Sequence, residues 1–162
     1  MYSWLADVMV RRSIRQMNAG DLRGLLRGFA DDAVLIFPGE HSWAGTYRGK
    51  REIERFFRRA VDTGLRFSVG DVVAKGPPWD MTVCFQLADR ATDADGSVVY
   101  ANRVMEHVKL SWGKIKRQEV YLDTQKVAAF DDSLGRAEPA TAAGRPGQAG
   151  RLEAEQGEAT SP

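Results

Sequence analysis

The chain of 162 residues has very little of what covalent or metal-based stabilisation requires. It contains a single cysteine, Cys84, so no disulfide can form within the chain, which agrees with a reducing compartment. Its two histidines, His41 and His107, lack neighbouring carboxylates or thiols at metal-ligand spacing. We therefore predict no metal site.

Long apolar runs and an excess of charge are also missing. No apolar stretch approaches the ~20 residues that span a bilayer, so we expect no membrane partner. The first residues lack a basic start followed by an apolar segment, which favours a cytoplasmic protein over an exported one. Lysine and arginine total 23 against 22 acidic residues. We expect no nucleic-acid partner, because such binding relies on a basic surface that neutralises phosphates.

Composition divides the chain into one domain and a tail. Hydrophobic residues make up 43% of the sequence and charged residues 28%, as in a globular protein of one core. Beyond Asp131, Ala, Gly, Pro and Glu dominate, and Leu152 is the only large apolar residue after Leu134. Such a segment buries too little apolar surface to offset the entropy of ordering it. We predict a domain over 1–131 and a disordered tail over 132–162.

Apolar periodicity predicts three helices. The first covers about 3–17, and the second follows Asp21, whose side chain can accept backbone N–H bonds at its start and whose apolar face includes Phe29. The third has the strongest pattern, with apolar residues at i, i+3, i+4, i+7 and i+8 from Ile53 to Val61. We expect it to lie flat on a sheet.

Short runs bounded by turn residues predict five strands. One apolar run, 33–37, lies between the second and third helices and ends at Pro38, and a loop follows it to Gly49. Four more follow the third helix in succession, at 65–74, about 81–87, 98–111 and 114–126. The order α-α-β-α-β-β-β-β indicates an α+β fold with a mainly antiparallel sheet and helices packed on one face.

Several short segments in this order resemble the nuclear transport factor 2-like superfamily, specifically its SnoaL-like branch, which is related to ketosteroid isomerases and polyketide cyclases. They are 18–22 (NAGDL), 29–34 (FADDAV), 45–49 (GTYRG), 113–115 (GKI) and 121–123 (YLD). The resemblance covers about 1–130. It implies a cystatin-like, cone-shaped sheet wrapped around the N-terminal helices, a pocket for a small apolar molecule at the open end of the cone, and a homodimer.

Alternation along 98–111 places two polar residues, Asn102 and Glu106, on the more apolar face. Burying them without partners would cost a few kcal/mol each, so they require internal hydrogen bonds or a pocket. We take both as candidate substrate-binding residues. Glu106 has a second interpretation, as half of a cross-strand ion pair with Arg117.

Asp123 is the leading candidate for catalysis. It shares a strand face with Tyr121, a candidate substrate-binding residue, and the resemblance implies that this face points inward, because the acid/base carboxylate of SnoaL-like cyclases matches Asp123. Desolvation in an apolar cone would raise its pKa and suit it to proton transfer near neutral pH. The alternative is a solvated or capping aspartate without chemistry. If Tyr121 and Asp123 point inward, Val120 and Leu122 point outward and would supply the dimer surface.

The loop after the first strand adds three candidates for substrate binding near the open end. Trp43 and Tyr47 can bury a ring while presenting a polar group, and His41 can titrate near neutral pH. Each can equally be a core, rim or exposed residue.

These residues suggest a cofactor-independent cyclase or isomerase acting by acid/base chemistry on a small carbonyl compound. Asp123 would transfer the proton, and Asn102 and Tyr121 would orient the substrate. The chain lacks the Asp-Pro of ketosteroid isomerases, since Phe37 precedes Pro38, and 102–106 lacks the Arg-x-Asp pair of limonene epoxide hydrolases. A non-catalytic ligand-binding or dimeric interaction module remains the main alternative, and an epoxide hydrolase the lesser one.

Overall fold

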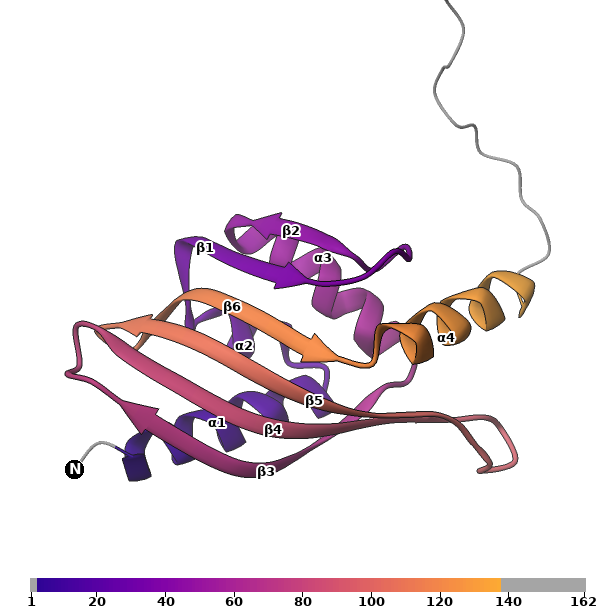
Figure 1. Cartoon of the computed structure of the whole chain (residues 1–162), viewed down its shortest axis with the longest axis horizontal. Coiled ribbons are helices and arrows are strands. Elements are labelled where there is room, and N and C mark those ends of the chain that lie inside the picture. The colour runs from indigo at the N-terminus through magenta and orange to yellow at the C-terminus, as the bar shows by residue number, and fades with distance from the viewer. Residues whose placement is uncertain (1–2, 138–162) are drawn as a thin grey trace, which may run out of the picture.

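A computed structural model of the chain describes residues 3–137, and most of the predicted tail lies outside them. Four helices and one six-stranded sheet make up this part (Figure 1). In chain order they are α1 (Ser3–Asn18), α2 (Leu22–Leu26), β1 (Phe29–Phe37), β2 (Gly45–Arg48), α3 (Gly49–Asp62), β3 (Arg66–Lys75), β4 (Met81–Thr92), β5 (Val98–Ser111), β6 (Lys114–Leu122) and α4 (Thr124–Ala137).

The sheet confirms the predicted α+β class. Its strands follow the order β2-β1-β6-β5-β4-β3, and every neighbouring pair is antiparallel except β1 and β6. The sheet curves, and α1, α2 and α3 lie on its concave side while α4 extends from the end of β6 (Figure 1). No helix within residues 3–137 is long and apolar enough to cross a membrane.

Three elements differ from the sequence-based predictions. Phe29 begins β1 instead of ending a helix, and a register shift between Phe29 and Val34 interrupts the strand's alternation, which concealed its first half. The short strand β2 lies inside the predicted loop at 39–49 and pairs with the edge of β1. Helix α4 occupies the predicted end of the last strand and continues past 132, where we expected the tail to begin.

Two apolar clusters form the core, and residues of both line a central space. The first joins α2, α3, β1 and α4 around the fully buried Phe29, Leu35 and Ile53. The second joins α1 to the inner faces of β4, β5 and β6 around Val83. The apolar face predicted for α3 is buried as expected, and each such side chain contributes ~1.5–3 kcal/mol through removal from water.

Candidate active site

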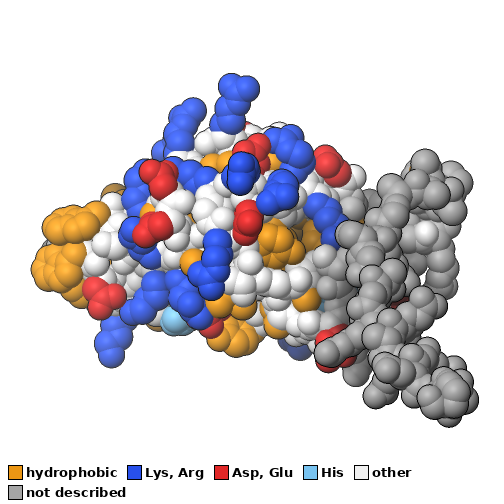
Figure 2. Space-filling model, turned by 90° about the horizontal axis from the view of Figure 1, so that it is seen from above, with side chains coloured by type: hydrophobic (Ala, Val, Ile, Leu, Met, Phe, Trp, Pro, Cys, Tyr) orange, Lys and Arg blue, Asp and Glu red, His pale blue; other side chains and the backbone are white. Residues whose placement is uncertain are grey.

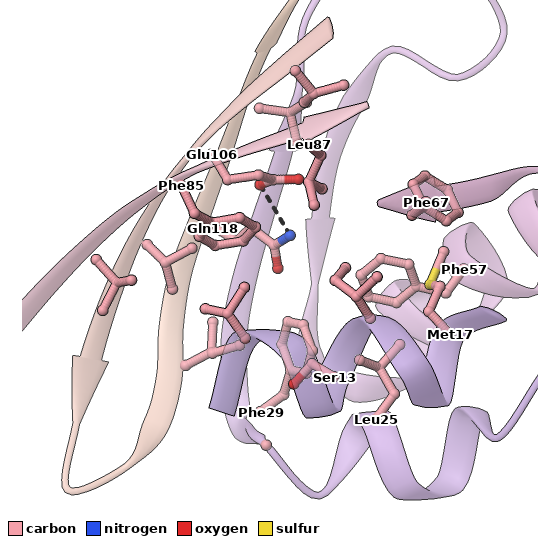
Figure 3. A pocket seen from close by; sticks show the side chains of 18 of the residues that line it. Ser13, Met17, Leu25, Phe29, Phe57, Phe67, Phe85, Leu87, Glu106 and Gln118 are labelled. Atoms are coloured by element: carbon pink, nitrogen blue, oxygen red, sulfur yellow. Dashed lines mark hydrogen bonds between the residues drawn. The ribbon is translucent and has the colours of Figure 1, made fainter. Parts of the chain in front are cut away.

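An apolar cavity of about 230 Å³ lies between the helices and the concave face of the sheet. Its wall contains side chains from α1, α2, α3, α4 and all strands except β2, and most are aliphatic or aromatic (Figure 3). The wall within residues 3–137 includes six side chains with hydrogen-bonding groups: Ser13, Trp43, Asp89, Tyr100, Glu106 and Gln118. A mostly apolar cavity with a few polar groups is the usual form of a small-molecule site.

One end of the cavity approaches the surface between α1, the loop after β3 and the turn between β5 and β6, because Leu5, Pro78 and Gly113 line it there. Hydrophobic side chains gather at this end of the molecule, on the left in Figure 2. Trp79 and Trp112 are 58% and 72% exposed, and their ring centroids are 5.9 Å apart. The approach to the cavity is therefore itself apolar.

Glu106 is one of the two carboxyl groups that the described residues contribute to the cavity wall. It lies on the inner face of β5 and is only 6% exposed. Gln118, from the inner face of β6, donates a hydrogen bond from Nε2 to Glu106 Oε2 at 3.1 Å (Figure 3). The other carboxyl oxygen, Oε1, has no hydrogen-bond partner among residues 3–137. One oxygen is thus held in place while the other is available to a ligand.

The surroundings of Glu106 favour its protonated form. Burial among apolar side chains raises the pKa of Glu106 to about 8, partly opposed by the hydrogen bond from Gln118 and assisted by the negative charge of Asp89. Near neutral pH the carboxyl group is therefore present in both protonation states. It can donate a proton as well as accept one, which is the property required of a general acid/base.

Further along the same inner face, Asp89, Tyr100 and Asn102 form a buried hydrogen-bonded network. Tyr100 Oη donates to Asp89 Oδ2 at 3.1 Å, and Asn102 Nδ2 donates to Tyr100 Oη at 3.2 Å and to the backbone oxygen of Asp123 at 3.0 Å. The Tyr100 ring stacks on Phe130 of α4, with centroids 4.6 Å apart. Asn102 is buried as predicted, but it supports the junction of β6 and α4 and does not line the cavity.

The predicted inward orientation of Asp123 and Tyr121 is wrong. Period-two alternation holds from Gln118 to Leu122, but its phase is opposite to the predicted one: Val120 is 6% exposed and Tyr121 is 56% exposed. Asp123 is exposed just before α4, where its Oδ1 accepts backbone N–H bonds from Gln125 at 3.1 Å and Lys126 at 3.3 Å. It therefore has the position and contacts of a helix N-cap.

The predicted ion pair between Glu106 and Arg117 is also wrong. Glu106 lies opposite Val120, whereas Arg117 lies opposite Lys109 and forms its ion pair with Glu119. Because Arg117 and Glu119 share the outer face of β6, their charged groups do not line the cavity. The phase of this one strand explains both errors.

The loop residues divide between the wall and its support. Trp43 is 3% exposed and lines the cavity, with the Arg59 guanidinium 4.1 Å from its ring centroid. Tyr47 does not line the cavity, but it supports Trp43 by donating a hydrogen bond from Oη to the Trp43 backbone oxygen at 2.7 Å. His41 packs edge-on against Phe37 without lining the cavity, and its ring nitrogens are buried without a partner among the described residues. Burial raises the pKa of Tyr47, while the charge of Arg59 lowers it.

Sequence reasoning missed Gln118, Asp89, Tyr100 and Ser13. The prediction gave β6 the opposite phase and therefore placed Gln118 on the outer face of the sheet. Ser13 lies on α1, for which the sequence predicted only an amphipathic helix and no polar side chain in the cavity wall. Asp89 had a usable signal, because it continues the alternation of Phe85 and Leu87 toward the end of β4. No group of three or more potential metal-binding side chains occurs in the part of the chain that the structure describes.

A curved sheet wrapped around helices, with an apolar cavity between them, defines the nuclear transport factor 2-like class of proteins. Within it, the family model described as a SnoaL-like domain matches residues 10–118, and the chain belongs to that family. A relative is an uncharacterised protein of Mycobacterium tuberculosis, 29% identical over 136 residues, which cover 75% of this chain and 92% of the relative.

The solved structures that share the fold include two that contain or act on small molecules. SalBIII, an epoxide hydrolase/cyclase-like enzyme with a role in pyran ring formation in the polyether salinomycin, is 18% identical over 76% of this chain and 94% of its own, with a TM-score of 0.62. RV0760c of Mycobacterium tuberculosis, in complex with estradiol-17beta-hemisuccinate, is 19% identical over 75% and 95%, with a TM-score of 0.61. Similarity at this level of identity establishes the fold, and the chemistry has to be argued from the site.

Proposed function

We propose that the protein is a cofactor-independent cyclase or isomerase that moves a proton on a small, largely apolar carbonyl compound, with Glu106 as the acid/base. The observation that carries this proposal is a buried carboxyl group in the wall of an apolar cavity, where burial raises its pKa to about 8. Two structural neighbours support the class of ligand, since one takes part in ring formation and another is in complex with a steroid derivative.

In this mechanism the ionised form of Glu106 removes a proton from a carbon next to the substrate carbonyl. The hydrogen bond from Gln118 to Oε2 fixes the carboxyl group, and Oε1 receives the proton. The protonated carboxyl group then returns the proton to another atom of the same molecule, so the enzyme is regenerated without any cofactor. A pKa near the working pH makes both transfers accessible, and general acid/base catalysis of this kind contributes ~10²–10⁴-fold to a rate.

The test is enzyme-dependent exchange of α-hydrogens of cyclic ketones with deuterated water, followed by mass spectrometry. Glu106→Gln keeps a side chain of the same shape that can still accept from Gln118, and we expect it to lower the exchange rate ~10²-fold or more. Asp123→Asn is the matched control, because asparagine retains the cap on α4 and we expect no loss of exchange. Loss of exchange in Asp123→Asn with full activity in Glu106→Gln would reverse these assignments. Ligand binding without exchange in any variant would favour the non-catalytic module.

The proposed homodimer requires a surface other than the one expected from sequence. Val120 and Leu122 line the cavity and are therefore unavailable to a partner. The outer face of the sheet instead exposes Val73, Met105 and Tyr121, at 65%, 43% and 56%. We propose that two copies pack through this face, because burial of such side chains removes apolar surface from water. A cytoplasmic location remains a prediction.

A further inference from the structure

Asp89 is a second buried carboxyl group in the cavity wall, and the acid/base proposal does not use it. It is only 8% exposed, and its Oδ1 is buried without a hydrogen-bond partner among residues 3–137. Burying a polar atom without a partner is unfavourable, and native proteins contain few such atoms. This atom therefore requires an explanation.

The groups around Asp89 fix its carboxyl group and leave Oδ1 free. Tyr100 Oη accepts from Asn102, so its own hydrogen is directed to Asp89 Oδ2. Burial raises the pKa of Asp89, while the hydrogen bond from Tyr100, the nearby backbone N–H groups of Asp89 and Asn102 and the charge of Lys126 lower it. In either protonation state Oδ1 can form a hydrogen bond that it lacks here, as a donor when protonated and as an acceptor when ionised.

Asp89 and Glu106 lie at two separate positions on the same inner face. Glu106 is opposite Phe85 on β4, and Asp89 follows Phe85 by four residues on that strand. At ~3.3 Å per residue, the two positions are roughly 13 Å apart along the strands. The inward side chains between them, Leu87 and Val104, are apolar. Two carboxyl groups of the cavity wall are thus separated by an apolar stretch.

We propose that Asp89, held by Tyr100, is a second polar anchor that binds a hydroxyl group at the far end of an elongated apolar ligand. The ligand class is then a rigid, extended molecule with one oxygen function at Glu106 and a hydroxyl at Asp89. A hydroxyl suits either protonation state of Asp89, because it can both donate and accept. The Glu106 end of this assignment rests on the proposed function, whereas the Asp89 end rests on the unpaired oxygen.

Calorimetric titration with three matched probes tests the anchor: biphenyl, 4-phenylphenol and 4,4′-dihydroxybiphenyl carry zero, one and two hydroxyls on one rigid frame. For the full-length protein we expect the diol to bind about tenfold or more tightly than the monohydroxy probe, a difference of ~1.4 kcal/mol. Asp89→Leu should remove this difference and leave the affinity for 4-phenylphenol within about threefold. Asp89→Asn should retain it, because its amide can donate and accept.

Equal binding of the two phenols by the native protein, or an unchanged preference in Asp89→Leu, would overturn the second anchor. If Asp89→Leu does not fold, a crystal structure of the native protein with the diol decides, because a hydroxyl placed away from Asp89 Oδ1 contradicts the proposal. Failure of all three probes to bind would contradict the anchor and the ligand-binding cavity together. Discrimination by Asp89 without any effect of Glu106→Gln on α-hydrogen exchange would leave the anchor and remove the catalytic proposal.

Discussion

At the scale of single residues, the raised pKa of Glu106 suits proton transfer in the cavity but lowers the free energy of unfolding as pH rises. Burial raises its pKa from 4.5 to about 8, so between these values the folded chain holds a proton that the unfolded chain releases. The free energy of unfolding must then fall as pH rises through this window, because the unfolded state binds fewer protons. Each pKa unit corresponds to ~1.4 kcal/mol, so the upper limit is a few kcal/mol.

We predict that urea unfolding will show this fall in stability between pH 5 and pH 8, and that Glu106→Gln will flatten it. Glutamine carries no charge at any pH, so the variant should be the more stable protein at pH 8 and close to the native protein at pH 5. Glu40→Gln, at an exposed position, is the control and should keep the native slope. A Glu106→Gln variant with an unchanged slope would show that the carboxyl group is more solvated than its burial indicates.

The buried polar residues show what sequence could predict at this scale. Asn102 and Glu106 were found because alternation alone identifies polar residues on an apolar strand face. Asp123 was assigned inward because β6 has polar and apolar residues on both faces, and period two cannot set the phase of such a strand. Pairing across strands decides it: Glu106 opposite Val120 places both side chains on the same inner face.

At the scale of elements, a partly buried ionic contact joins α4 to the rest of the domain. Asp131 accepts from the Ser42 backbone nitrogen at 2.7 Å and from its hydroxyl at 2.6 Å, and its carboxylate lies 2.8 Å from Arg59. Burial raises the pKa of Asp131, but the hydrogen bonds from Ser42 and the charge of Arg59 outweigh this and hold it below its usual range. The contact joins α4 to the loop before β2, next to Trp43 in the cavity wall.

We predict that Asp131→Asn will destabilise the protein by ~1–3 kcal/mol, because a charged acceptor of several hydrogen bonds becomes neutral. Hydrogen exchange followed by mass spectrometry should show faster exchange of α4 amides than of β4 amides. Asp132→Asn, at the adjacent exposed position, should leave both unchanged. Equal acceleration throughout the domain would mean that α4 does not open separately from the sheet.

Elements with a strong local pattern were predictable, and those that depend on distant partners were not. Helix α3 was found from its apolar spacing alone. The four residues of β2 become a strand by pairing with β1, and α4 is positioned by Val127 and Phe130 packing into the core. Neither partner can be identified from the sequence around the element itself.

At the scale of the whole molecule, the outer face of the sheet should determine the state of association. We predict a dimer mass in light scattering at micromolar concentration and a monomer mass for Met105→Glu, which introduces a charge between Tyr121 and Gln86 on neighbouring strands. Val98→Glu is the control, because Val98 is 52% exposed at the start of β5 and away from this group. A native protein of monomer mass would contradict the prediction.

The parallel pairing of β1 with β6 has a consequence for how the chain folds during synthesis. Phe29 pairs with Ile115, so the first strand made must wait for the last before the sheet is continuous. Strands β3, β4 and β5 can form successive hairpins meanwhile, because their partners are adjacent in the chain. Contacts between distant residues slow folding. A ribosome-bound chain that ends before β6 would therefore expose the apolar side chains that later enclose the cavity, and chaperones would be expected to bind at this stage.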